Sequence, residues 1–241
     1  MTPTVRSTPV QAAAVFGSRL GQAEAYVRLL ADTGISHGLI GPREAPRLWD
    51  RHVLNSAVVA PLFSRGATVA DIGSGAGLPG IPLAIARPDL QLTLVEPLQR
   101  RVVWLRATVE ELGLTNVMVH HGRAESLWST GGFAYATARA VAATAELARI
   151  TLPLLSENGR LHALKGDRAE LELTRDQRAL TALGAVDCQI TRWGAGVVLP
   201  ETVVLSVTVG SAAAGSSGSS PGVEKRRSGR RSAGRRGTGK R

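Results

Sequence analysis

The stretch V-A-D-I-G-S-G-A-G-L-P-G-I-P, residues 69–82, decides the fold that this sequence predicts. An apolar run over residues 67–72 leads directly into four glycines, Gly73, Gly75, Gly77 and Gly80. Apolar strand-forming residues followed by glycines indicate a buried strand that ends in a sharp turn. Residues 81–87 then predict a short helix. The stretch therefore predicts the first strand, loop and helix of a nucleotide-binding α/β sheet.

Two cofactor classes fit this glycine loop. The pattern G-x-G-x-x-G from residue 75 is the dinucleotide fingerprint, and a match to it alone has low specificity. The pattern G-x-G-x-G from residue 73, with Asp71 two residues before it, fits the loop that binds S-adenosylmethionine equally well. A second predicted strand, residues 91–95, ends at Glu96, about 20 residues after the glycines, where a carboxylate can accept both ribose hydroxyls in either class.

Strands and helices alternate along most of the chain. The periodicity of apolar residues predicts helices over residues 10–30, 46–63, 97–112 and 147–155. Asp167 with Glu170 has the spacing of a capping box and predicts the start of one more helix. Further strands are expected at residues 116–120, 133–139 and 159–164, followed by an antiparallel pair at 185–191 and 202–209. This order predicts an α/β fold, a doubly wound, mostly parallel, Rossmann-like sheet with an N-terminal helical cap.

We expect three parts in the 241 residues: a helical cap over residues 1–65, the cofactor-binding sheet domain over 66–210, and a disordered basic tail over 211–241. The tail has nine Lys and Arg residues and one acid, so it carries +8 of the net charge of +10. Its Gly, Ser, Ala, Arg and Lys composition provides no apolar core. Such a polycation either adds salt-sensitive attraction to nucleic acid or is a solvated extension without a specific role.

Composition also bounds the compartment and the partners. The single cysteine, Cys188, excludes internal disulfides and fits a reducing compartment. The first twenty residues contain no solid apolar block, and no stretch approaches the length of a membrane span. We therefore expect a cytoplasmic protein that does not enter a membrane, and nothing in the sequence demands more than a monomer. His120 and His121 have no carboxylate or thiol at ligand spacing, so no metal is expected.

Charged side chains follow several of the predicted strands. Glu96 ends the second strand, Arg123 follows the third, Arg139 ends the fourth and Lys165 ends the fifth. Ligands of an open parallel sheet bind at the carboxyl ends of its strands. A cofactor on the glycine loop would therefore lie near all four side chains.

Six short motifs together resemble one family. They are L-W-D-R-H (48–52), D-I-G-S-G-A-G-L-P-G-I-P-L-A (71–84), V-E-P (95–97), R-A-E (123–125), A-R-A-V (138–141) and A-L-K-G (163–166). The glycine loop alone is not specific, whereas this combination is. It resembles the ribosomal RNA small subunit methyltransferase G family, also called glucose-inhibited division protein B, and within it an actinobacterial-like member. The resemblance covers about residues 25–210.

The resemblance implies a reaction and a set of site residues. The reaction is methyl transfer from S-adenosylmethionine to N7 of a guanine in 16S ribosomal RNA, in the decoding region of the small subunit. The residues implied to contact the cofactor are Gly73, Leu78, Ala124, Glu125 and Arg139. Gly75 belongs to the same loop, and Glu96 is assigned to the ribose by its position at the end of a strand. Candidate contacts to the substrate are Arg51, His52, Arg123 and Lys165.

Guanine N7 carries an in-plane lone pair and no proton, so its methylation requires no base. Catalysis then depends on positioning and on the exclusion of water, and we expect no dedicated catalytic acid or base. Two other functions stay open at this point. An NAD-linked oxidoreductase would use the dinucleotide pattern, and a non-enzymatic RNA-binding factor would depend on the basic tail.

Overall fold

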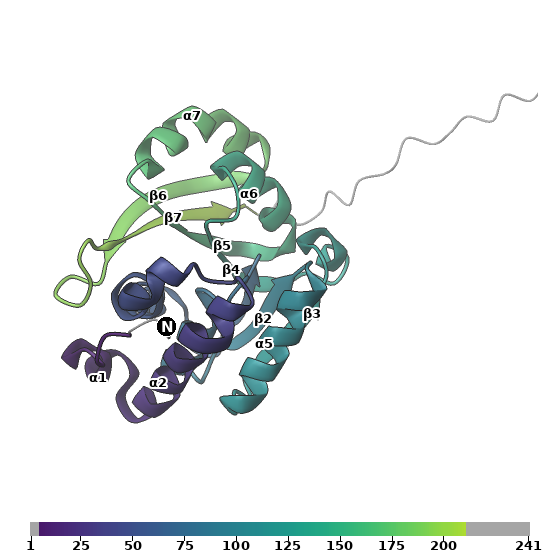
Figure 1. Cartoon of the computed structure of the whole chain (residues 1–241). Helices are drawn as coiled ribbons and strands as arrows, with labels where there is room; N and C mark the ends of the chain where they lie inside the picture. Colours follow the sequence, from purple (N-terminus) through teal and green to yellow (C-terminus); the bar gives the residue numbers. More distant parts are fainter. Residues whose placement is uncertain (1–4, 211–241) are drawn as a thin grey trace, which may run out of the picture.

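The computed structural model describes residues 5–210 and contains one seven-stranded sheet (Figure 1). Its order is β3-β2-β1-β4-β5-β7-β6. The strands are β1 (Thr68–Ile72), β2 (Gln91–Glu96), β3 (Val117–His121), β4 (Phe133–Arg139), β5 (Leu155–Lys165), β6 (Ala185–Trp193) and β7 (Thr202–Val209). Strands β1 to β5 pair in parallel, and β7 is antiparallel to both β5 and β6. The predicted mostly parallel sheet and its final antiparallel pair are confirmed.

Helices cover both faces of the sheet, which makes it doubly wound as predicted (Figure 1). One face carries α1 (Val10–Phe16), α2 (Leu20–Leu29), α4 (Gly80–Ala86) and α5 (Gln99–Glu111), whose buried residues form one hydrophobic cluster with β1 and β2. The other face carries α6 (Thr144–Thr151) and α7 (Ala169–Ala182), which pack with β4, β5 and β7 in a second cluster. β1 lies between its parallel neighbours β2 and β4 and contributes side chains to both clusters, and every residue of it except Thr68 is buried.

The segment before β1 differs from the two predicted helices. The first breaks at Gly17, where φ is +53°, into α1, the 3-10 turn η1 (Gly17–Arg19) and α2, and it continues as the π-helix η2 (Leu30–Gly34). The second is a series of short pieces, and Pro46 and Pro61 each remove a backbone donor within the predicted range. These pieces are the 3-10 helix η3 (Pro42–Arg47), the π-helix η4 (Leu48–Leu54), α3 (Asn55–Ala57) and η5 (Ala60–Leu62).

Three further boundaries differ from the sequence prediction. The capping box of Asp167 and Glu170 is wrong, because α7 begins after Arg168 and has no side-chain cap; the Ala169 N–H donates instead to the Gly166 carbonyl. Strand β5 begins at Leu155, four residues before the prediction. The helix predicted over 147–155 is α6 followed by a 3-10 turn, η7 (Leu152–Leu154), with Pro153 at its start.

Across residues 5–210, none of the helices has both the length and the hydropathy needed to cross a bilayer. The predicted tail, residues 211–241, lies outside the described residues. The proposed boundary between residues 65 and 66 stays a prediction.

Candidate cofactor and substrate site

The glycine loop joins β1 to α4 at the carboxyl end of the sheet. Gly73 and Gly75 have φ values of +66° and +58°, a backbone conformation that residues with a Cβ rarely adopt. The Gly73 N–H donates to the Val95 carbonyl at 2.9 Å. A Cβ at Gly73 would lie 2.9 Å from Cγ2 of Val141, in the connection between β4 and α6. The loop is therefore held between β2 and the segment that follows β4.

Glu96, at the end of β2, is tied directly to this loop. Its side chain is buried, and Oε2 accepts the Gly75 N–H at 3.0 Å while Oε1 accepts the Leu98 N–H at 2.9 Å. The Arg101 guanidinium lies 3.6 Å from Oε2. The structure thus places the Glu96 carboxylate against the glycine loop, as their spacing in the sequence predicted. A ribose bound here would share or replace these backbone donors.

Asp71, in β1, contacts the far end of the glycine loop. It is fully buried, and Oδ2 accepts the Gly80 N–H at 3.1 Å, which pins the start of α4 to β1. Within residues 5–210 its other oxygen, Oδ1, has no hydrogen-bond partner. Burial raises the pKa of Asp71 to about 7, and the nearby Glu96 charge adds to the increase.

Arg139 is a half-buried cation at the end of β4, the neighbour of β1. Its Nη2 lies 3.0 Å from Nδ1 of His52, and Nη1 donates to the His52 carbonyl at 3.4 Å and to Oγ of Ser56 at 3.3 Å. No carboxylate of residues 5–210 lies within ion-pair distance of it, and burial lowers the pKa of Arg139. A desolvated guanidinium with neutral partners is suited to a bound anion.

His52 connects Arg139 to Glu44. Because a guanidinium only donates, Nδ1 of His52 accepts from Arg139, so Nε2 carries the proton and donates to Oε2 of Glu44 at 2.9 Å. Burial and the charge of Arg139 lower the pKa of His52, although Glu44 opposes this effect. His52 is therefore neutral near pH 7, with its tautomer set by two partners. Glu44 was not among the predicted site residues, because no sequence motif relates it to a residue eight positions later.

The other predicted site residues occupy different environments. Leu78 and Ala124 are buried, with 8% and 4% of their surface exposed. Glu125 lies 3.8 Å from the guanidinium of Arg149 on α6. Arg51 and Arg123 are exposed. The structure thus leaves Arg51 and Arg123 open to a large ligand.

Lys165 ends β5, as predicted, but its ammonium group is engaged within the protein. Nζ lies 2.9 Å from Oε2 of Glu172 on α7 and donates to the Ala142 carbonyl at 3.4 Å. Only 10% of its side chain is exposed. Lys165 joins β5 to α7 and to the connection between β4 and α6, so it has little surface left for a substrate.

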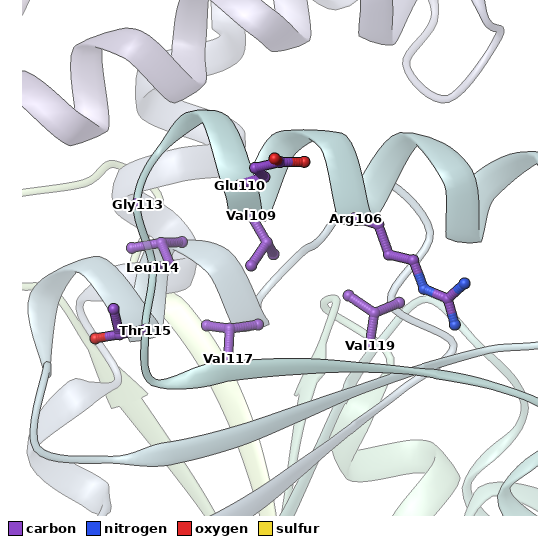
Figure 2. Close-up of a pocket in the computed structure, with 8 residues that line it drawn as sticks. All are labelled: Arg106, Val109, Glu110, Gly113, Leu114, Thr115, Val117 and Val119. Carbon is purple, nitrogen blue, oxygen red and sulfur yellow. The ribbon is translucent and has the colours of Figure 1, made fainter.

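Two hollows on the surface lie beside α5 rather than at the glycine loop. One is a groove of about 330 Å³ between α5 and the edge strand β3, where Val109 faces Val117 and Val119 (Figure 2). The other, of about 410 Å³, lies between α2 and α5 and is lined in part by Trp104. Neither includes a residue of the glycine loop or a predicted site residue. In the described part of the chain, no three His, Cys, Asp or Glu side chains form a group suited to a metal ion.

The strand order, the glycine loop after β1 and the acidic residue that ends β2 define a Rossmann-like, class I S-adenosylmethionine-dependent methyltransferase fold. The S-adenosylmethionine-dependent methyltransferase SibL shares this fold with a TM-score of 0.55 and 20% identity, over 83% of this chain and 70% of that one.

Family membership follows from the sequence. The model of the rRNA small subunit methyltransferase G family (GidB) matches residues 19–198. The ribosomal RNA small subunit methyltransferase G of Rhodococcus jostii is 54% identical over 200 residues, 81% of this chain and 88% of that one. The protein of the same name from Mycolicibacterium smegmatis is 50% identical over 205 residues, 84% and 87% of the two chains. This chain belongs to the ribosomal RNA small subunit methyltransferase G family, as its motifs predicted.

Proposed function

We propose that this protein transfers a methyl group from S-adenosylmethionine to N7 of a guanine in 16S ribosomal RNA, in the decoding region of the small subunit. The observation that supports the cofactor is the glycine loop, which is bonded to Glu96 and next to Arg139. Family membership supports the substrate. The same membership favours a methyltransferase over both alternatives, the NAD-linked oxidoreductase and the non-enzymatic RNA-binding factor.

The described residues fit an S-adenosylmethionine ligand in three respects. Gly75 has no side chain, and a Cβ there would meet only the Gly73 carbonyl oxygen at 3.8 Å, so a ligand can approach the backbone after β1 closely. Glu96 presents a carboxylate at the end of β2, where the ribose of a nucleotide lies in open α/β sheets. The cationic Arg139 has no carboxylate partner in residues 5–210 and suits the ligand's own carboxylate. We assign the cofactor to Gly73, Gly75, Leu78, Glu96, Ala124, Glu125 and Arg139.

The chemistry requires positioning rather than proton transfer. When bound, S-adenosylmethionine supplies an electrophilic methyl group on a sulfonium. The lone pair of guanine N7 forms the new N–C bond as the S–C bond breaks, and the positive charge passes from sulfur to the base. No proton moves, so the chain needs no general base. The arrangement around His52 fits this, because Arg139 and Glu44 occupy both of its ring nitrogens.

For the substrate, the exposed Arg51 and Arg123 are the better candidates among the four predicted contacts. His52 and Lys165 already have partners within the protein, so a direct contact to RNA would require these to be exchanged. A cytoplasmic location and a monomeric state also belong to this proposal, since the proposed substrate is ribosomal RNA and a single chain provides every assigned residue.

The test is a radiolabelled methyl-transfer assay. Small subunits from cells that lack this gene are the substrate, and subunits from wild-type cells are the control. We expect label in 16S RNA only from the deficient cells, recovered as 7-methylguanosine. Label in another base would refute the N7 assignment. Absence of label, with S-adenosylmethionine binding still measurable by calorimetry, would refute the substrate, and binding of NAD instead would refute the cofactor.

A further inference from the structure

Three exposed arginines lie beside the proposed site on the segment before α3. Arg43 and Arg47 belong to η3 and Arg51 belongs to η4, four residues apart along the chain. We call these three the arginine surface. The side chains of Arg47 and Arg51 are 54% and 53% exposed, and both lie near one carboxylate, Glu44, at 4.0 Å and 3.7 Å. They therefore lie on the same side of the segment.

The arginine surface is next to the carboxyl end of β4. Arg51 directly precedes His52, whose carbonyl and ring nitrogen both contact the guanidinium of Arg139. The charge of Arg51 is close enough to Arg139 to lower its pKa. β4 pairs with β1, which leads into the glycine loop. A long ligand on this surface would therefore reach the cofactor site.

Positive charge is concentrated at this place. Residues 5–210 contain twenty Lys and Arg and eighteen Asp and Glu. Together with Arg6 and Arg139, the arginine surface contributes five cations, and the two anions that lie within ion-pair distance of these cations are Glu44 and Asp50. This group carries +3, because His52 between them is neutral. The other fifteen cations and sixteen anions of residues 5–210 carry −1, so the net positive charge of the described protein lies here.

The guanidinium groups of the arginine surface have free donors. Within residues 5–210, neither Arg43, Arg47 nor Arg51 donates a hydrogen bond, and the distances to Glu44 exceed hydrogen-bond length. Other arginines of the protein instead donate two hydrogen bonds to a single carboxylate each: Arg87, Arg149 and Arg175. A free guanidinium offers a planar pair of donors that matches two oxygens of a phosphate.

We propose that the arginine surface binds backbone phosphates of the substrate RNA and thereby orients the target base toward the cofactor site. This inference depends on the proposed function for the identity of the RNA. Phosphate contacts fix register and orientation without reading sequence. The surface would thus supply position, and the pocket around the cofactor would supply the choice of base.

The experiment compares two triple variants of the full chain that lose the same charge. The first replaces Arg43, Arg47 and Arg51 with Gln. The control replaces three other exposed arginines that donate no hydrogen bond within residues 5–210, namely Arg65 before β1, Arg160 on β5 and Arg178 on α7, also with Gln. Binding to small subunits and to protein-free 16S RNA is measured as a function of salt concentration, and cofactor affinity is measured by calorimetry.

We expect the surface variant to bind both RNA substrates at least about ten-fold more weakly at physiological salt. The slope of log K against log salt should fall by about one for each phosphate contact removed, so by about two to three in total. The control variant should change the slope by less than one. Similar slopes for the two variants would overturn the proposal, since only general charge would then matter.

A second outcome would also overturn it. If the surface variant lost affinity for subunits but not for protein-free 16S RNA, the partner would be a ribosomal protein rather than RNA. The single variant Arg47→Gln, at a side chain with more than half of its surface exposed, tests the same slope by about one unit if the triple variant fails to fold. The binding measurements do not depend on methyl transfer, so the two proposals can be refuted separately. A wild-type protein that binds RNA without methylating it would refute the proposed function and leave the role of the arginine surface intact.

Discussion

Gly73→Ala is the most informative single change in the glycine loop, because Gly75→Ala provides a matched control. Both positions have φ near +60°, so both alanines carry the cost of a left-handed conformation, about 1–2 kcal/mol. Only the new methyl at position 73 meets a close neighbour, Cγ2 of Val141 at 2.9 Å, whereas the nearest atom at position 75 is the Gly73 carbonyl oxygen at 3.8 Å. Val141 is β-branched, which restricts its χ1 rotamers, so the new methyl must be accommodated by a shift of the exposed segment that carries it.

The overpacking at position 73 adds about 1–3 kcal/mol. We therefore expect Gly73→Ala to lower the free energy of unfolding by about 2–5 kcal/mol and Gly75→Ala by about 1–2 kcal/mol. The double variant with Val141→Ala should recover the overpacking cost, because it removes the methyl that the new Cβ meets. Urea unfolding followed by circular dichroism measures the three free energies, and calorimetry with S-adenosylmethionine measures the affinity of each variant.

Two results would refute this reasoning. Equal destabilisation by Gly73→Ala and Gly75→Ala, with no recovery from Val141→Ala, would show that the segment after β4 does not restrain the glycine loop. Unchanged cofactor affinity and methyl transfer in a Gly73 variant with a bulky side chain would show that the cofactor does not bind at this loop.

Three further predictions concern ionisable groups. The Asp71 carboxyl group binds a proton more tightly in the folded state than in the unfolded state, because its pKa is raised in the folded state. Its contribution to the free energy of unfolding therefore falls by up to about 4 kcal/mol as the pH rises from about 4 to 8. The difference in unfolding free energy between wild type and Asp71→Asn should show this slope, and a difference that does not change with pH would contradict the raised pKa. Lys165→Met should destabilise by about 1–3 kcal/mol because it removes the cation from Glu172 and leaves only the Thr144 hydroxyl as its hydrogen-bond partner. Adding Glu172→Leu should restore part of the loss. A neutral single variant with weakened RNA binding would instead make Lys165 a substrate contact. Deletion of residues 211–241 removes +8 of charge, so it should reduce the salt slope of RNA binding while cofactor affinity stays at the wild-type value; loss of cofactor binding would contradict the proposed division of the chain.

The sheet could be predicted from the sequence because most of its strands coincide with short runs of apolar residues. β4 and β7 have the predicted bounds, and β2 and β3 agree within one residue. β2 and β4 are central parallel strands with runs of buried residues, and these runs are short and rich in β-branched and aromatic residues or end at polar ones, which favours a strand over a helix. The two long helices predicted before β1 were wrong. The apolar spacing of this segment is helical, but its prolines and Gly17 divide it into short helices and turns.

The site could be predicted only as far as topology determines it. Glu96 ends β2 and Arg139 ends β4, and both strands pair with β1. Their approach to the glycine loop, which follows β1, is therefore a result of the strand order. The contact between Arg139 and His52 joins residues 87 positions apart, and it depends on how the N-terminal segment packs. The partners of Glu44 and Lys165 are likewise products of packing, to which no sequence spacing points.

The position of β7 has a consequence for synthesis. Within residues 5–210, β7 is the last strand made, yet it lies between β5 and β6, and β6 has no other neighbour in the sheet. The chain is synthesised from its N-terminus, so β6 has no strand to pair with until the residues of β7, up to Val209, have been added. A premature stop before Thr202 would leave the edge of β5 uncovered and β6 without a partner strand, so the product would be prone to aggregation and degradation. The order of the strands thus makes translation as far as Val209 a condition for a finished sheet.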